Sequence, residues 1–130
     1  MKKNAKDYYI VENYNCAETT LRLANEYYKL NITEDDLKLV AGFGGGFGCG
    51  MTCGNLCADI AVLSKIYVEK KAHEGKTIGR LCKMFVSEFK KKFNGTSCAY
   101  IKKRVAVDQN RCLSAVEENF ELLKDFISRN

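Results

Sequence analysis

Apolar residues recur every three or four positions along most of this chain, and the chain contains no proline. Such spacing places apolar side chains on one face of an α-helix, whereas a half-buried strand would show strict alternation. Proline, which interrupts helices by removing a backbone donor, is nowhere available to break them. We therefore predict an all-α fold, a single-domain bundle of five to six helices with a glycine-rich loop between helices 2 and 3.

The length of 130 residues suits one domain, because it can bury one hydrophobic core without disulfide support. We expect this helical domain to span residues 1–130, with residues 1–13 as a flexible or helical N-terminal extension. Asn15 and Thr33 are predicted to cap the first two helices, and Gly42 is predicted to end the second. Further helices are predicted to start between Thr52 and Gly54, at Thr77 (ending near Phe93), at Cys98, and shortly before Leu113.

Seven glycines and three cysteines lie within the twenty residues AGFGGGFGCGMTCGNLCADI, positions 41–60. No register fits the dinucleotide-binding pattern G-x-G-x-x-G, and no strand is predicted before it, so we do not expect a nucleotide site. Glycine permits positive φ angles and close backbone approach. We predict an irregular, ordered loop over residues 41–52, and candidate site backbone at Gly44, Gly45, Gly46, Gly48 and Gly54.

The chain has seven cysteines, an odd number that does not suit a secreted disulfide framework. Four of them lie within a residue or two of a predicted helix start, where free amides and the helix dipole favour a thiolate. These candidate catalytic cysteines are Cys16, Cys53, Cys98 and Cys112. Cys57 and Cys82 lie in apolar helical patterns and are interpreted as small core residues, and the pattern assigns no role to Cys49.

A net charge of +5 arises from lysines and arginines spread along the chain, without a nucleic-acid-binding motif. We expect no nucleic-acid partner. The N-terminal residues lack the apolar core of a signal peptide, and no apolar run is long enough for membrane insertion, so we expect a cytoplasmic protein. The single histidine, His73, excludes sites that need two histidines and is expected at the surface.

Five stretches of the chain together resemble the C_GCAxxG_C_C family of putative redox-active proteins. They are YNCAETTLRLANEYYKLN, AGFGGGFG, the Cys53-Gly54 pair, FVSEFKKKFNGTSCAYI and RCLSAVEENFELL, and they span residues 14–123. The four family cysteines match Cys16, Cys53, Cys98 and Cys112. The Cys-Gly-Ala-x-x-Gly motif of the family matches imperfectly, because Asn55 replaces its alanine and Ala58 its final glycine. The resemblance implies a redox role and, since transporter genes are frequent neighbours, association with a transporter system.

Three functions follow from these residues. The first is thiol-disulfide exchange with a redox partner protein or a small-molecule thiol, in which Cys53 attacks and Cys16, Cys98 or Cys112 resolves. Gly54 and the helix start are expected to leave Cys53 open and the most reactive of the seven. The second is a metal ion or an iron-sulfur cluster bound by the same four cysteines. The third is a structural partner of a transporter or enzyme complex, with no cofactor.

Overall fold

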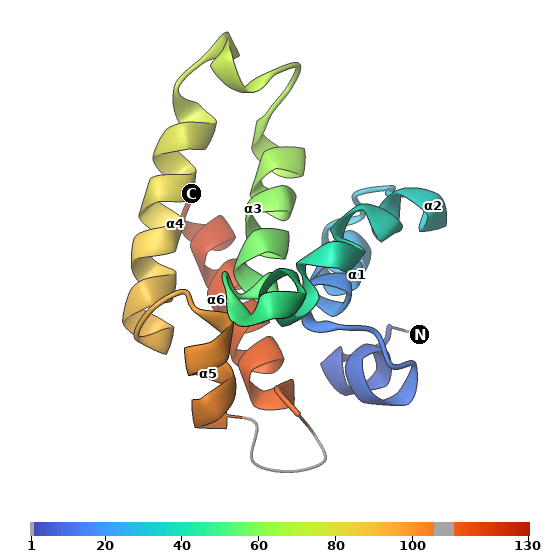
Figure 1. Ribbon diagram of the computed structural model, residues 1–130. Coiled ribbons are helices and arrows are strands. Elements are labelled where there is room, and N and C mark those ends of the chain that lie inside the picture. The colour runs from blue at the N-terminus through green and yellow to red at the C-terminus, as the bar shows by residue number, and fades with distance from the viewer. Residues whose placement is uncertain (1, 106–110) are drawn as a thin grey trace.

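The computed structural model describes residues 2–105 and 111–130, and within them it confirms the all-α prediction (Figure 1). No strand forms in these ranges, although Thr52 and Ser97 make one isolated antiparallel bridge. The α-helices are α1 (Cys16–Tyr28), α2 (Glu34–Leu37), α3 (Gly54–Tyr67), α4 (Thr77–Phe93), α5 (Cys98–Val105) and α6 (Leu113–Arg129). Shorter helical turns are η1 (Asp7–Val11), η2 (Lys38–Phe43), η3 (Gly46–Gly50) and η4 (Ala72–Glu74).

Helix α3 is the centre of the fold and packs against α1, α4, α6 and η2. The largest side chains of the core come from α3, α4 and α6 and are fully buried; they include Leu63, Phe85, Phe89, Leu123 and Phe126. Phe85 meets Phe126 edge to face, with ring centroids 5.2 Å apart, a favoured aromatic geometry. In the described ranges, no helix combines the length and the apolar character needed to cross a membrane.

The helix starts follow the capping residues predicted from the sequence. The Asn15 side chain accepts from the Glu18 amide (2.9 Å), and the Glu18 carboxylate accepts from the Asn15 amide (3.0 Å), which completes a capping box. Thr33 accepts from the Asp36 amide in the same way. Gly42, however, does not end the second helix, because the chain tightens into the 3₁₀ turn η2 and continues to Phe43.

Residues between η2 and α3 carry a run of left-handed backbone conformations. Positive φ angles occur at Gly45, Gly46, Gly48 and Gly50, and also at Phe47 (φ 62°). The run leads into the bridge to Ser97, where the Cys53 amide donates to the Thr96 carbonyl (2.7 Å) and the Cys98 amide donates to the Met51 carbonyl. The starts of α3 and α5 are therefore joined by backbone hydrogen bonds.

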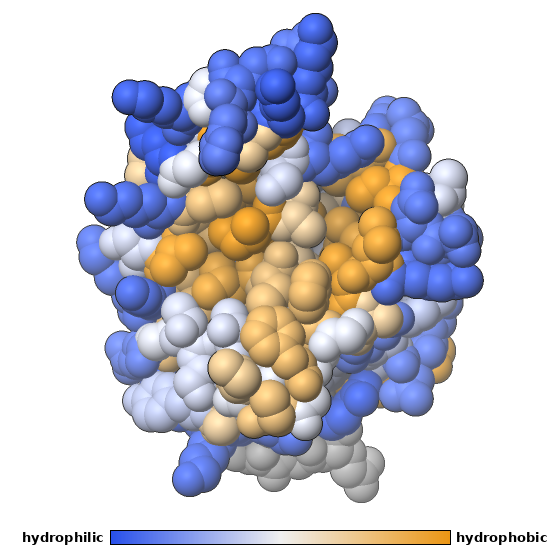
Figure 2. Space-filling model, turned by 45° about the horizontal axis from the view of Figure 1, so that its top comes forward, coloured by the Kyte–Doolittle hydropathy of each residue, from blue (hydrophilic) through white to orange (hydrophobic). Residues whose placement is uncertain are grey.

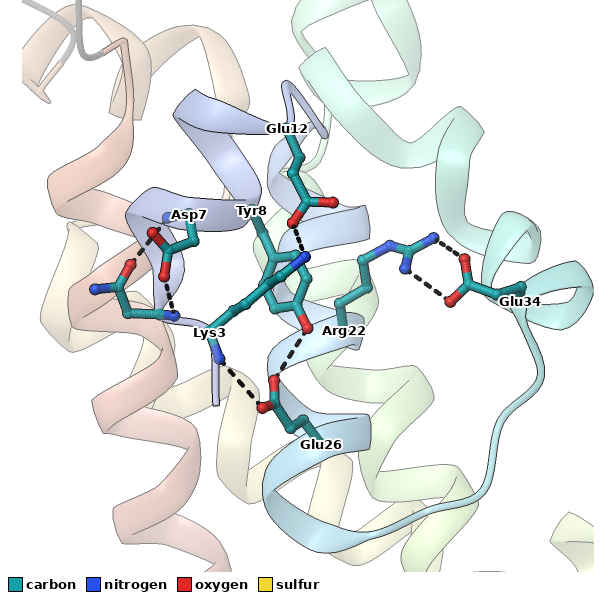
Figure 3. A network of polar contacts seen from close by, with 8 residues as sticks. Lys3, Asp7, Tyr8, Glu12, Arg22, Glu26 and Glu34 are labelled. Carbon is teal, nitrogen blue, oxygen red and sulfur yellow. Dashed lines mark hydrogen bonds and ion pairs between the residues drawn. The ribbon is translucent and has the colours of Figure 1, made fainter. Parts of the chain in front are cut away.

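The N-terminal segment is fastened to α1 by a network of polar contacts (Figure 3). The Tyr8 hydroxyl donates to the Glu26 carboxylate (3.0 Å), and the Lys3 amide donates to the same carboxylate (3.2 Å). Arg22 forms two 3.0 Å hydrogen bonds with Glu34 and so links α1 to α2. The contacts of Lys3 and Tyr8 with Glu26 hold the N-terminal segment and η1 on α1, and Tyr9 of η1 is buried.

The contact between Gly54 and α1 gives a test of the packing. A methyl group on Gly54 would lie 2.7 Å from the Cys16 sulfur and 2.8 Å from the Phe43 carbonyl oxygen, so Gly54→Ala should lower the free energy of unfolding by about 1–3 kcal/mol. Gly79→Ala is the matched control in α4, because its methyl group would meet nothing within 4 Å and should stabilise by about 0.4–1 kcal/mol. Urea unfolding measures both, and equal effects would contradict the close approach.

Candidate functional site

One cavity of about 220 Å³ brings together the four cysteines singled out from the sequence. It opens among η1, the glycine segment and the starts of α1, α3, α5 and α6. Its lining consists of Tyr9, Asn15, Cys16, Gly45, Cys53, Asn55, Cys98, Ile101, Lys102, Arg111 and Cys112. The other three cysteines do not line it.

Each of these cysteines stands at the beginning of a helix. Cys16 and Cys98 are the first residues of α1 and α5, and Cys53 and Cys112 directly precede α3 and α6. The first amides of a helix have no intrahelical partner, and the helix dipole adds positive potential there. Four positive helix ends thus face one cavity, which is the electrostatic setting that favours negative charge on sulfur.

Cys53 and Cys16 form the inner part of the site. Cys53 is only 5% exposed, and burial raises the pKa of its thiol to about 12. The nearby Cys16 sulfur contributes to this rise, whereas the backbone amides of Asn55 and Leu56 act against it. Burial also raises the pKa of Cys16, against the effect of the Gly45 amide.

The expectation that Gly54 leaves Cys53 open to attack is wrong. The side of Gly54 that lacks a side chain is filled by the Cys16 sulfur and the Phe43 carbonyl group. The missing side chain allows α1 to approach α3 closely, and this approach buries Cys53. The amides of Asn55 and Leu56 at the start of α3 favour a thiolate at Cys53, but desolvation outweighs them.

Cys98 and Cys112 form the outer part of the site, and both are half-buried. Burial raises the pKa of the Cys112 thiol, and the neighbouring Cys98 sulfur raises it further. Lys102, the Tyr9 hydroxyl and Arg111 act in the opposite direction and lower it. Two cations, Lys102 and Arg111, therefore act on Cys112.

Tyr9 closes one side of the cavity, and sequence reasoning missed it. Its hydroxyl accepts from the Cys112 amide (3.3 Å), and the Arg111 guanidinium lies 4.3 Å from the centre of its ring and donates to its carbonyl oxygen. Burial raises the pKa of Tyr9 to about 12, so the hydroxyl keeps its proton at neutral pH. Tyr9 precedes the first predicted helix, and no local pattern connects it with Cys112.

The glycines predicted to form the site backbone differ in how close they lie to the cavity. Gly45 lines the cavity and presents its amide to Cys16. Gly44 packs against the Asn15 side chain, and a methyl group on Gly46 would lie 2.7 Å from the Cys98 side chain. A methyl group on Gly48 would meet no described atom within 4 Å, and Gly48 does not line the cavity.

All seven cysteines are free thiols in this structure. In the part of the chain that the structure describes, no three His, Cys, Asp or Glu side chains are grouped closely enough to hold a metal ion. The four sulfurs therefore share a cavity without forming a ready ligand set.

The model of the C_GCAxxG_C_C family, described as "Putative redox-active protein (C_GCAxxG_C_C)", matches residues 14–126, and the chain belongs to this family. The match includes all four cysteines of the cavity. No curated protein and no solved structure matches the chain.

A buried polar cluster lies directly behind the cavity, between α1, α3 and α6. Asn55, which lines the cavity and is 2% exposed, accepts from the Thr20 hydroxyl (2.9 Å). One turn further along α3, the fully buried Asp59 accepts from the Asn119 amide (2.9 Å), and burial holds the pKa of Asp59 well above its usual range.

Two oxygens of this cluster, Asp59 Oδ2 and Asn119 Oδ1, have no hydrogen-bond partner among the described residues. Both are acceptors when Asp59 is ionised, so neither can satisfy the other. A proton on Asp59 Oδ2 provides a donor for the Asn119 oxygen and removes the cost of a buried charge. The protonated acid is therefore the form that this environment favours.

Asp59→Asn tests this assignment. The folded protein keeps a proton on Asp59 that the unfolded chain releases above about pH 4, so wild-type stability should fall as pH rises from there to the folded pKa. The variant has no such proton. The free energy of unfolding of Asp59→Asn, relative to that of the wild type, should therefore rise by about 1.4 kcal/mol per pH unit between pH 4 and the folded-state pKa of Asp59. Urea unfolding from pH 4.5 to 7.5 measures this difference.

Asp125→Asn, which removes an exposed carboxyl group from α6, controls for the loss of a charge. A difference between wild type and Asp59→Asn that stays constant with pH would mean that Asp59 is ionised in the folded protein.

Proposed function

We propose that the chain is a dithiol redox protein in which the four cysteines of the cavity act as two pairs, an outer pair of Cys98 with Cys112 and an inner pair of Cys16 with Cys53. The observation that carries the proposal is the gathering of four helix-start cysteines on one cavity. Membership of a family described as redox-active supports it.

The pairing is supported by the influence that each sulfur has on the others. Among charged neighbours, Cys98 has the largest effect on the pKa of Cys112, and Cys16 has the largest effect on that of Cys53. Cys98 also raises the pKa of both inner thiols, so the two proposed pairs belong to one linked group of four sulfurs. The backbone bridge at Ser97 keeps the two pairs adjacent, because it joins the starts of α3 and α5.

The outer pair is proposed to meet the partner, because both of its thiols are half-buried and Cys112 has cations beside it, whereas the inner pair includes the buried Cys53. Cys98 is the proposed attacking thiol. It is the first residue of α5, and Lys102 follows one helical turn later in the same cavity. A positive helix end and a nearby ammonium group both stabilise a thiolate, the form that attacks a disulfide.

In the proposed exchange, the outer pair reduces a disulfide of the partner. Cys98 releases its proton to water, and its sulfur attacks one sulfur of the partner's disulfide, whose S–S bond breaks; the leaving thiolate takes up a proton. Cys112 then loses its proton and attacks the Cys98 sulfur, which forms the Cys98–Cys112 disulfide and releases the second partner thiol. The protein dithiol is oxidised by two electrons, and the partner disulfide is reduced to two thiols.

The inner pair is proposed as the store of a second pair of electrons. Because burial raises the pKa of both inner thiols, they are expected to react with the outer disulfide rather than with solvent. A redox partner protein or a small-molecule thiol in the reducing cytoplasm would complete the cycle.

Metal or iron-sulfur cluster binding is the second candidate, since four cysteines on one cavity match the ligand count of such sites. It would require the four sulfurs to move together from their present positions. Near-stoichiometric metal in protein purified anaerobically without chelator would favour it over dithiol exchange.

Trapping of the mixed disulfide tests the exchange. Reduced protein is mixed with oxidised glutathione at neutral pH, and peptide mass spectrometry locates each adduct; an adduct on exposed Cys49 is expected in every variant. Cys112→Ser should accumulate one glutathione on Cys98, because the resolving thiol is gone, and Cys98→Ser should react at least about tenfold more slowly than wild type.

Cys82→Ser is the matched control, since it removes a half-buried thiol outside the cavity, and it should behave as wild type. Wild-type rates for Cys98→Ser, or an adduct on Cys53 in Cys112→Ser, would contradict the proposed roles.

A further inference from the structure

The outward face of α3 is largely apolar, although the described chain covers it only in part. Cys57, Ile60, Ala61 and Ser64 share this face by their helical spacing, and all four are half-buried. Between Gly54 and Leu63 the only polar side chains are those of Asn55 and Asp59, and both point into the core. A helix that is apolar on all sides is normally buried on all sides.

Neighbouring elements extend this apolar face into a continuous surface, visible as the hydrophobic area in the centre of Figure 2. Leu39 (78% exposed) and Phe47 (43%) contribute from η2 and η3, together with Met51 (59%). Half-buried Cys82 and Val86 extend it onto α4. Contiguous exposed apolar surface of this kind marks an interaction site in soluble proteins.

The two sides of this surface carry opposite charge. α3 lies between α4 and η2, and η2 continues directly from α2 (Figure 1). On the α4 side, exposed Lys83 and Lys90 make no ion pair with any described residue. On the α2 side stand the exposed carboxylates of Asp36 and of Asp35, and Asp35 pairs with Lys38 on the same side (3.0 Å). Hydrophilic residues border the apolar area on both sides in Figure 2.

We propose that this surface binds a second copy of the same chain and forms a two-fold symmetric dimer. A two-fold axis that runs along α3 places α3 against its counterpart and α4 of each copy opposite α2 of the other. The lysines of one copy then face the aspartates of the other at both edges, around an apolar centre.

The charges also select this arrangement over its alternative. An axis across α3 would place α4 opposite α4, with Lys83 and Lys90 facing the same lysines, and like charges at an interface are unfavourable. A second copy is thus complementary to the surface in both hydrophobicity and charge. The cysteine cavity opens elsewhere, among the helix starts, so the dimer does not depend on the proposed redox function.

Sedimentation equilibrium of the full chain under reducing conditions tests the dimer. Wild type should dimerise with a dissociation constant at or below about 1 μM, and Ala61→Glu, which places a charge at the apolar centre, should be monomeric. Ser114→Glu adds the same charge at an exposed position on α6 and should dimerise as wild type. Circular dichroism verifies that each variant is folded.

A charge exchange tests the orientation without altering the apolar centre. Lys83→Glu with Lys90→Glu should weaken the dimer at least about tenfold, as should Asp35→Lys with Asp36→Lys. The four changes together should restore the dissociation constant to within about threefold of the wild-type value, since glutamates on α4 would then face lysines on α2 of the other copy.

A wild-type chain that stays monomeric at a concentration of about 100 μM, 100-fold above the expected dissociation constant, would overturn the proposal. Binding of an acidic peptide or of lipid vesicles to this surface, without dimerisation, would also overturn it. A dimer that survives Ala61→Glu in the folded protein would place the interface elsewhere.

Discussion

The close approach of α1 to α3 at Gly54 is the constraint on which the site depends. Any side chain at this position would meet the Cys16 sulfur and the Phe43 carbonyl group. The contact brings two helix starts together, and the backbone bridge between Thr52 and Ser97 adds the start of α5. Four cysteines separated by as many as 96 positions in sequence, from Cys16 to Cys112, thereby face one cavity.

Two opposing effects decide how these thiols differ. A helix end favours a thiolate, but burial opposes ionisation and outweighs it at Cys53, whose pKa rises to about 12. Beside Cys112, Lys102 and Arg111 counteract burial. The same helix α3 that buries Cys53 also buries Asp59 among apolar residues and turns an apolar face outward, so it lacks the polar outer face of an ordinary surface helix.

Much of the fold follows from local sequence signals, because caps and periodicity act within a few residues. Asn15 and Thr33 cap as expected, and α4 has its predicted bounds, Thr77 and Phe93. The burial of Cys53 could not be predicted in this way, since it depends on the Cys16 sulfur, which lies far away in the sequence. Tyr9 and Arg111 were missed for the same reason: their contact with each other and with Cys112 exists only in the tertiary structure.

Alkylation rates of the individual thiols test the division into outer and inner pairs most directly. The reduced protein is pulsed with iodoacetamide at neutral pH, and peptide mass spectrometry follows each cysteine, with exposed Cys49 as the reference for an accessible thiol. Cys98 and Cys112 should label faster than Cys16 and Cys53, and Cys53 should be at least about tenfold slower than Cys98 because it is both buried and protonated. Labelling of Cys53 as fast as Cys98 would contradict this account.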